Sequence, residues 1–133
     1  MDENNNITTE DKVVLIVEDE KPMAKTLNLK LQKAGFNTMV ANDGQTALDI
    51  LNKNKIDLVL LDLIIPQIDG FAVLKELKKR KETIPIIVIS NLGQEDDMNL
   101  ARDLGVVDYF IKVNTPMVKI VDKVKACLNE GDC

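Results

Sequence analysis

Charged and hydroxyl side chains stand directly after four short apolar runs of this chain, and together they could handle a phosphoryl group. Glu18 and Asp19 follow the first run, Asp62 the third, Ser90 the fourth and Lys112 the fifth. Three carboxylates in one crevice would repel each other, by roughly 4 kcal/mol for a pair about 4 Å apart at an effective dielectric of about 20. Either the carboxyl groups take up protons or a cation binds, and an all-oxygen site with room for water suits Mg²⁺.

A divalent ion, an ammonium group and a hydroxyl around one aspartate would form a cradle for phosphoryl oxygens, with Asp62 as the nucleophile. Taken singly, each residue has an ordinary explanation. An acidic pair before a helix commonly caps it, an aspartate or serine at a strand end can orient a turn, and a lone lysine is usually solvated. The chemistry therefore depends on whether the fold brings these side chains together.

Five apolar runs of strand length alternate with five stretches in which apolar residues recur three and four positions apart, the spacing of a helix face. Residues with β-branched side chains, which favour strands, are prominent in most of these runs. The strand-like runs span residues 13–17, 38–41, 56–61, 84–89 and 108–111, and the helical stretches span residues 24–34, 47–51, 71–77, 98–104 and 117–128.

Residues at the ends of the helical stretches support these boundaries. Gly35 and Gly105 follow the first and fourth stretches, where a glycine suits a helix C-terminus. Thr115-Pro116 opens the fifth stretch with a hydroxyl N-cap and a proline at the first helical position. The basic segment 78–81 ends the third stretch, where cations suit the negative end of the helix dipole. We interpret this segment as a solvated helix end rather than a nucleic-acid patch.

Strands that are apolar almost throughout must be covered on both faces. The chain is therefore expected to be an α/β protein, with a doubly wound five-stranded parallel sheet between helical layers. In such sheets, ligands bind outside the carboxyl ends of the strands, where the polar groups above would meet. A length of 133 residues leaves room for one domain, since domains typically take about 100 to 200. We expect that domain at residues 12–128, between a flexible leader at 1–11 and a flexible tail at 129–133.

The composition argues against several classes of function. Lys and Arg total 17 against 22 Asp and Glu, a net charge of −5 that disfavours a broad nucleic-acid surface. The polar, acidic N-terminus is unlike a signal peptide, and no apolar run approaches the roughly 20 residues that span a bilayer. Cys127 and Cys133 are close enough to fasten a tail but not a fold, so reduced cysteines are the simpler interpretation. We therefore expect a cytoplasmic protein with no direct contact to nucleic acid or membrane.

Several of these residues, in this order, resemble the receiver domain of two-component response regulators, over nearly the whole chain from about Lys12 to Leu128. The resemblance implies the flavodoxin-like (βα)5 receiver fold. In that family, an acidic pair follows the first strand, an aspartate before a proline and an Asp-Gly turn ends the third, a Ser or Thr ends the fourth, and an aromatic residue lies three positions before a lysine. The matching residues here are Glu18-Asp19, Asp62 with Pro66 and Asp69-Gly70, Ser90, and Tyr109 with Lys112.

The resemblance implies a phosphoacceptor switch rather than an enzyme. Asp62 would accept a phosphoryl group from a phosphohistidine on a sensor histidine kinase or a phosphotransfer protein. Mg²⁺ would be held by the carboxylates of Glu18, Asp19 and Asp62 and by the backbone carbonyl of Ile64.

The resemblance also implies how a signal would leave the domain. Lys112 and Ser90 would bind the phosphoryl oxygens, and as Ser90 moves toward them, Tyr109 would turn inward to fill the vacated space. Such a shift between two packings is driven by the difference in phosphoryl contacts. The fourth helix, fifth strand and fifth helix, residues 94–128, would then present a changed face to a downstream effector protein. A second copy of the chain, in a phosphorylation-dependent homodimer, is the other expected partner.

Two positions beside the site depart from the family's usual pattern. The family lysine is usually followed by proline in a cis peptide, whereas Lys112 precedes Val113. Because a cis bond without proline costs roughly 3 to 4 kcal/mol, we expect the loop after the fifth strand to differ. Asn91 replaces a small residue, so it is expected either to hinder the inward path of Tyr109 or to contact the phosphoryl group itself.

Two apolar residues also bear on the chemistry. Ile64 and Leu92 lie two positions beyond Asp62 and Ser90, at the positions that in the family flank the attacking water. Apolar side chains there would shield the acyl phosphate, so we predict slow self-dephosphorylation. Ile64 also argues against a phosphohydrolase or phosphotransferase with an aspartyl phosphate, because such enzymes commonly place a second acid at that position.

Other functions fit parts of the sequence. A degenerate receiver that binds partners without being phosphorylated is the strongest rival, because of Asn91 and Val113. The chain is expected to act as a stand-alone regulator, and the alternative is an isolated receiver fragment of a larger one. A flavin-binding electron carrier would share the fold class, but it needs a phosphate loop rich in Ser, Thr and Gly where this chain has Glu-Asp-Glu-Lys-Pro.

Overall fold

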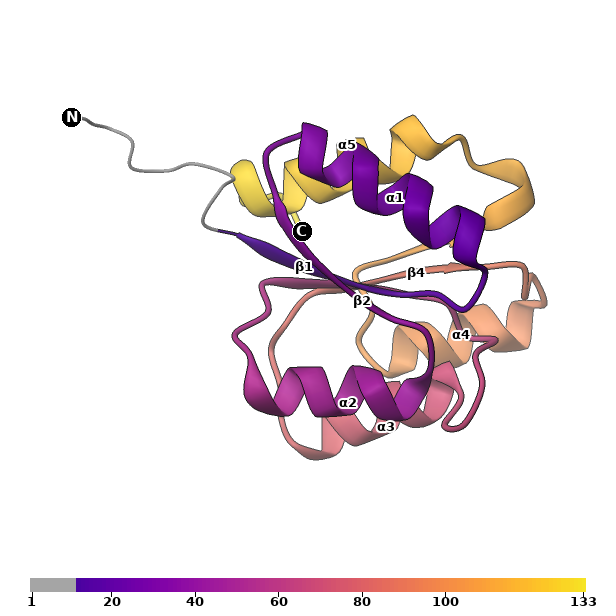
Figure 1. Ribbon diagram of the computed structural model, residues 1–133. Coiled ribbons are helices and arrows are strands. Elements are labelled where there is room, and N and C mark those ends of the chain that lie inside the picture. Colours follow the sequence, from indigo (N-terminus) through magenta and orange to yellow (C-terminus); the bar gives the residue numbers. More distant parts are fainter. Residues whose placement is uncertain (1–11) are drawn as a thin grey trace.

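The computed structural model describes residues 12–133. Five strands alternate with five α-helices along this part of the chain, and the strands form one sheet (Figure 1). The predicted flexible leader at residues 1–11 lies outside the described residues. The strands are β1 (Val13–Val17), β2 (Asn37–Ala41), β3 (Leu58–Leu61), β4 (Ile86–Ser90) and β5 (Asp108–Ile111), and the helices are α1 (Lys21–Lys33), α2 (Gly44–Lys53), α3 (Gly70–Lys79), α4 (Glu95–Asp103) and α5 (Met117–Asn129).

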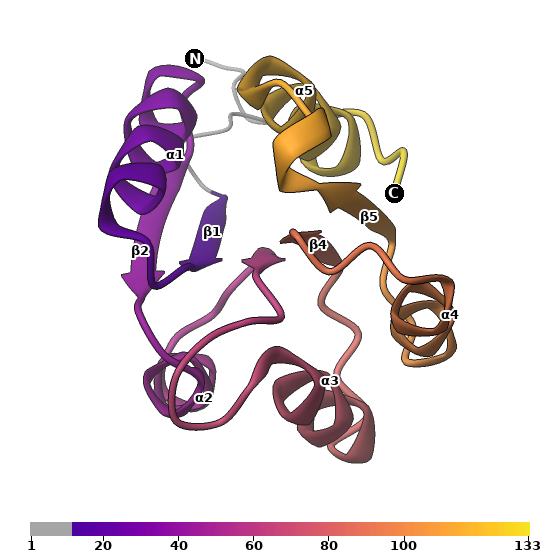
Figure 2. The same ribbon diagram turned by 90° about the vertical axis from the view of Figure 1, so that its right-hand side faces the viewer.

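The strands are all parallel, in the order β2-β1-β3-β4-β5, and helices cover both faces of the sheet (Figure 2). Successive strand residues point to opposite faces. Leu15 and Val17 pack with α2, α3 and α4, whereas Val14 and Ile16 pack with α1 and α5. The predicted doubly wound α/β fold is therefore confirmed, with the strand order of flavodoxin-like proteins. Among the described residues, no helix has both the length and the apolar character needed to cross a membrane.

The inner strands are buried along nearly their whole length, while the edge strands β2 and β5 are partly exposed. Two strands begin later than predicted, β3 at Leu58 and β4 at Ile86. Pro85 lacks an N–H to donate to a neighbouring strand, and its carbonyl instead accepts a hydrogen bond from the Val59 N–H at 3.0 Å. Strand β4 also runs one residue further than predicted and ends at Ser90 itself.

Side-chain caps hold the starts of two helices. Asp43 and Asp69 precede α2 and α3, and each accepts a hydrogen bond from a backbone N–H in the first turn. The prediction that Thr115 caps α5 is wrong, because Pro116 occupies the N-cap position. The Thr115 hydroxyl donates instead to the carbonyl of Ile111 at 2.8 Å.

Three of the five helices in the described residues, α1, α4 and α5, are followed by a glycine with a positive φ angle. Gly35 and Gly105 have φ angles of 98° and 91°, which side chains rarely tolerate, so the predicted stops of α1 and α4 are confirmed. After α5, the chain turns back and the Asp132 N–H donates to a carbonyl of the helix at 2.9 Å. The expectation of reduced cysteines is wrong, because this return joins Cys127 and Cys133 in a disulfide. The cysteines therefore no longer argue for a reducing compartment.

Candidate functional site

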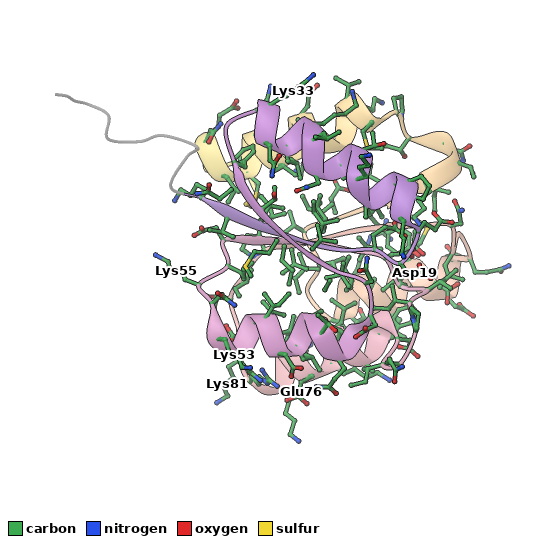
Figure 3. The ribbon with its side chains drawn as sticks, viewed as in Figure 1. Asp19, Lys33, Lys53, Lys55, Glu76 and Lys81 are labelled. Carbon is green, nitrogen blue, oxygen red and sulfur yellow. A yellow bond between two sulfur atoms is a disulfide. The ribbon has the colours of Figure 1, made fainter. Side chains whose placement is uncertain are left out.

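The carboxyl ends of the strands meet at one edge of the sheet, which faces the viewer in Figure 2. Val17 pairs with Leu61 in the parallel register, so Glu18 and Asp62, each one residue further on, lie side by side. A pocket of about 140 Å³ opens at this edge, where Asp19 is labelled in Figure 3. It is lined by Asp19, Glu20, Asp62, Ile64, Asn91 and Lys112.

Asp62 is the most deeply placed carboxylate of the pocket lining, with 2% of its surface exposed. Its backbone N–H donates to the Val17 carbonyl at 3.0 Å, so the end of β3 is fixed to β1. Its carboxylate Oδ1 accepts a hydrogen bond from the Ile64 N–H at 3.0 Å, and Oδ2 lies 2.7 Å from the Lys112 ammonium. Asp62 is therefore held at three points, with a cation directly beside one of its carboxylate oxygens.

Lys112 forms ion pairs with three carboxylates. Its Nζ lies 2.7 Å from Asp62, 2.8 Å from Glu18 and 3.0 Å from Glu20, and only 8% of the side chain is exposed. Burial lowers the pKa of Lys112, but its contacts with the three carboxylates outweigh that effect and raise the pKa well above its usual value. The ammonium therefore stays charged at any physiological pH.

Glu20 is the member of this group that sequence reasoning missed. Its side chain is 59% exposed and reaches Lys112 from the mouth of the pocket. The available signal was its place in the acidic run Glu18-Asp19-Glu20, of which only the first two residues have counterparts in the family motif. Glu20 gives the lysine a partner that a phosphoryl group would have to replace or rearrange.

Glu18 is fully buried, and its position is fixed by its backbone. Its N–H donates to the Ala41 carbonyl at 2.9 Å, and its carbonyl accepts from the Asn42 side chain at 2.9 Å. Burial raises the pKa of the Glu18 carboxyl, an effect that the Lys112 ammonium and the Glu20 N–H partly offset. Although Oε1 lies 2.8 Å from the lysine nitrogen, it accepts no hydrogen bond within the described part of the chain. Oε1 is therefore held by its charge pairing with Lys112 rather than by a well-aligned hydrogen bond.

Glu18, Asp19 and Asp62 fit a divalent cation. Each offers a carboxylate oxygen, and these three atoms all lie within 4.8 Å of one another. Lys112 supplies one positive charge against these three carboxylates, so the site carries surplus negative charge. Oxygen ligands beside an open pocket with room for water are what Mg²⁺ prefers. Ile64 lines the same pocket, and the role of its backbone carbonyl as a ligand stays a prediction.

Ser90 lies at this edge but forms no hydrogen bond with the carboxylates in the described residues. It is fully buried as the last residue of β4, and its Oγ accepts a long hydrogen bond of 3.4 Å from the Leu92 N–H. No hydrogen bond in residues 12–133 joins it to Asp62 or Lys112. A phosphoryl group on Asp62 would therefore have to draw the hydroxyl toward it.

Tyr109 projects from β5 toward the loop after β4. Its hydroxyl donates to the Leu92 carbonyl at 2.5 Å, so the ring is tied to the segment that carries Ser90. Burial raises the pKa of the Tyr109 phenol, and the negative charges of Asp97 and Asp62 raise it further. The proposed switch residues Ser90 and Tyr109 thus meet at Leu92, through its N–H and its carbonyl.

The loop after β5 differs from the family pattern, as its sequence indicates. None of the peptide bonds in the described residues is cis, and a short 3₁₀ turn, Lys112–Asn114, follows the strand. Asn91 lines the pocket, and its side-chain oxygen accepts a hydrogen bond from the Val113 N–H at 3.1 Å. The two departures from the family pattern, Asn91 and Val113, are therefore in direct contact.

The loop after β3 is held by backbone contacts that the sequence motifs did not reveal. The Gly44 N–H, at the start of α2, donates to the Pro66 carbonyl at 3.2 Å, and the Gly70 N–H donates to the Leu63 carbonyl at 3.0 Å. Gln67 adopts a φ of 69°, which a residue with a side chain seldom takes. The segment that follows Asp62 is thus folded tightly against α2 and against itself.

Comparison with known sequences identifies what this chain is similar to. A family model described as the response regulator receiver domain matches residues 14–125. The chain is 33% identical over 121 residues to the alkaline phosphatase synthesis transcriptional regulatory protein PhoP of Bacillus subtilis. That match covers 91% of this chain and 50% of PhoP, so the chain spans about half the length of this curated relative.

Solved structures show the same likeness. The receiver domain of the Francisella response regulator 1452 superposes with a TM-score of 0.85 at 28% identity, covering 91% of this chain and 99% of that one. The Mn²⁺-bound form of the response regulator Rcp1 gives a TM-score of 0.77 at 29% identity, covering 90% of this chain and 95% of that one. The likeness therefore extends over the elements that form the pocket.

Proposed function

The chain belongs to the response regulator receiver domain family, and from this membership we propose that Asp62 is its phosphoacceptor. The observation that carries the proposal is the geometry around this carboxylate. Asp62 is almost fully buried, its Oδ2 lies 2.7 Å from a lysine ammonium, and two further carboxylates lie beside it. Such a site combines a nucleophile, a fixed cation and surplus negative charge at one point.

The proposed reaction is a transfer of a phosphoryl group between two side chains. A carboxylate oxygen of Asp62 forms a bond to the phosphorus of a phosphohistidine on a sensor histidine kinase or a phosphotransfer protein. The phosphorus–nitrogen bond breaks at the same time, and its electron pair returns to the imidazole. Lys112 would bind one phosphoryl oxygen and neutralise charge that develops there.

Mg²⁺ is the proposed cofactor. Glu18, Asp19, Asp62 and the backbone carbonyl of Ile64 would hold it, directly or through water. When bound, the ion would offset the charge of the carboxylates and of the incoming phosphoryl oxygens. The surplus of carboxylates over the single lysine at this site supports the assignment, as does the Mn²⁺-bound form of the similar protein Rcp1.

The output would be a change of packing around Ser90. We propose that this hydroxyl moves toward the phosphoryl group and that Tyr109 then gives up its hydrogen bond to the Leu92 carbonyl and turns inward. Asn91 could offer its amide nitrogen to the phosphoryl oxygens, because its oxygen is already bonded to Val113.

The face formed by α4, β5 and α5 is the proposed surface for signalling. Strand β5 is an edge strand of partial burial, so no further strand of the described chain covers its outer side. In the proposal, this face binds a downstream effector protein or a second copy of the chain, without direct contact to nucleic acid or membrane. We place this action in the cytoplasm and treat the domain as a switch rather than an enzyme.

Phosphorylation with a small donor tests the proposal directly. Incubation with acetyl phosphate and Mg²⁺ should add the mass of one phosphoryl group, as read by intact mass spectrometry. Asp62→Asn should abolish the gain, and removal of the metal with EDTA should suppress it. Asp69→Asn is the matched control, because it makes the same chemical change at an exposed position of the same loop, and an asparagine can still cap the helix there.

The outcome also separates the alternatives. A wild-type chain that gains no mass, or an Asp62→Asn variant that still gains it, would contradict the phosphoacceptor role and favour an interaction module that works without phosphorylation.

A second experiment identifies the partner of the activated domain. Light scattering is measured with and without fluoroberyllate, which mimics an acyl phosphate. A doubling of the molar mass would support a homodimer, and an unchanged mass would favour a different effector as the partner.

A further inference from the structure

Two residues that neighbour the proposed phosphoryl ligands are joined across the mouth of the pocket. Asn91 follows Ser90 at the end of β4, and Val113 follows Lys112 in the 3₁₀ turn. The side-chain Oδ1 of Asn91 accepts a hydrogen bond from the Val113 N–H at 3.1 Å. This bond links the segment that carries the serine to the segment that carries the lysine.

The 3₁₀ turn takes one hydrogen-bond acceptor from a distant residue. The first N–H groups of any helical turn lack partners within the turn, and Ile111, which precedes it, makes no side-chain cap. Asn91 supplies the acceptor from 22 positions earlier in the chain. Packing does not hold the two residues together, because the Val113 side chain is 76% exposed and Asn91 is also exposed.

Lys112 needs an anchor when the phosphoryl group arrives. Before phosphorylation, its ammonium is placed by ion pairs with Asp62, Glu18 and Glu20. An acyl phosphate on Asp62 moves negative charge outward into the pocket, so these ion pairs have to be remade with phosphoryl oxygens. The backbone of the turn then determines which positions the ammonium can reach.

We propose that Asn91 is a positioning residue for Lys112, acting through its hydrogen bond to the Val113 N–H. This inference rests on the proposed function of Asp62 as phosphoacceptor. The bond fixes the position of the 3₁₀ turn that carries Lys112 relative to the end of β4. A movement of Ser90 toward the phosphoryl group is thereby passed to the turn that carries the second phosphoryl ligand.

A double-mutant cycle on the full chain tests this coupling. Asn91→Ala removes the acceptor, and an ester in place of the Val113 amide, introduced by semisynthesis, removes the donor. Each change is expected to slow phosphorylation by acetyl phosphate and Mg²⁺ by about 2- to 10-fold, the rate equivalent of one hydrogen bond. Because both changes delete the same bond, the double variant should be no slower than the slower single variant. Asn114→Ala, at an exposed position of the same turn, should leave the rate unchanged.

Amide hydrogen exchange reports on the bond itself. In Asn91→Ala, the Val113 N–H should exchange faster, while the Thr115 N–H, bonded to the Lys112 carbonyl at 3.3 Å, should keep its protection and so show that the turn remains folded. Equal phosphorylation rates for Asn91→Ala and Asn114→Ala, or fully additive effects in the double variant, would overturn the inference and leave the proposed function intact. A wild-type chain that takes up no phosphoryl group would overturn both.

Discussion

Two loops at the same edge of the sheet, one after β3 and one after β4, are held in opposite ways. The loop after β3 is fixed by backbone that approaches backbone. A Cβ atom added at Gly44 would lie 1.8 Å from the carbonyl oxygen of Ile68, and one added at Gly70 would lie 2.5 Å from the Cα of Leu63. No side chain fits at either position without a shift of the main chain.

The loop after β4 is held by side-chain hydrogen bonds instead. Tyr109 donates to the Leu92 carbonyl, and Asn91 accepts from Val113. A Cβ atom added at Gly93 would meet only a methyl group of Ile111, at an ordinary contact distance of 3.5 Å. This loop therefore has space around it and contacts that can be exchanged.

This difference between the two loops matches two different requirements of the proposed site. The loop after β3 begins at Asp62, which in the proposed mechanism must keep its place while a donor protein delivers a phosphoryl group. The loop after β4 begins at Ser90, which is not hydrogen-bonded to Asp62 and which has to move in the proposed mechanism. Rigid backbone packing suits the first task, and a few reversible hydrogen bonds suit the second.

The largest effect expected on this comparison comes from adding a methyl group to each loop. Gly70→Ala should lower the free energy of unfolding by about 1 to 3 kcal/mol, the usual cost of overpacking. Gly93→Ala should change it by less than about 0.5 kcal/mol. Urea unfolding of both variants measures the contrast, and equal losses would show that the two loops are held alike.

Removing a hydrogen bond from the second loop should have a smaller effect. Tyr109→Phe deletes the donor to the Leu92 carbonyl, a bond with a net contribution of about 0.5 to 1.5 kcal/mol. We expect faster amide exchange in residues 91–94 and no change in residues 63–69. Exchange that rises equally in both segments would contradict the independence of the two loops.

Substitutions of the two apolar residues near the proposed attacking water should also distinguish the two loops. Ile64 is 54% exposed, so Ile64→Asn should shorten the phosphoryl lifetime a few-fold while leaving stability close to that of the wild type. Leu92 is partly buried against the core, so Leu92→Asn should lower stability as well. A lifetime that is no shorter after Ile64→Asn would show that this side chain does not shield the acyl phosphate.

The smallest expected effect is the raised pKa of Tyr109, which a titration of this residue measures in the second loop alone. Tyr109 is the only tyrosine and the chain has no tryptophan, so the phenolate absorbance follows this one group. Its pKa is raised from 10.0 by burial and by Asp97 and Asp62. Folding stability should therefore fall as the pH rises from 10.0 through the raised value, because the unfolded chain releases the proton first. Asp97→Asn should bring the pKa partly back, and a wild-type phenol that titrates at or below 10.0 would contradict the assigned surroundings.

Much of the fold could be predicted because each element carried its own local signal. Continuous apolar runs identified the strands, and Gly35 and Gly105 marked helix ends. The predicted strand starts at 56 and 84 were wrong by two residues, since Ile56 and Ile84 are apolar but lie outside the strands. The disulfide was also missed, because composition describes a compartment and not the return of the chain that brings Cys133 to Cys127.

The acidic pair, Asp62 and Lys112 could be predicted to meet because parallel strands end at the same edge of a sheet. Contacts that depend on side-chain reach were not predictable in this way. Glu20 reaches Lys112 from an exposed position, and Asn91 bonds to Val113 across a gap in the chain of 22 positions. These pairings follow from the relative placement of two loops, for which the sequence has no periodic signal.

The sheet of this protein divides its apolar interior into two separate clusters, one beneath α2, α3 and α4 and one beneath α1 and α5. Within residues 12–133, no buried residue belongs to both clusters, so a change of packing volume on one side need not be compensated on the other. The two outer faces of the domain are accordingly free to diverge in sequence independently while they share one unchanged pocket. The proposed signalling face takes α4 from one cluster and α5 from the other, so a partner bound there would contact helices supported by both halves of the interior.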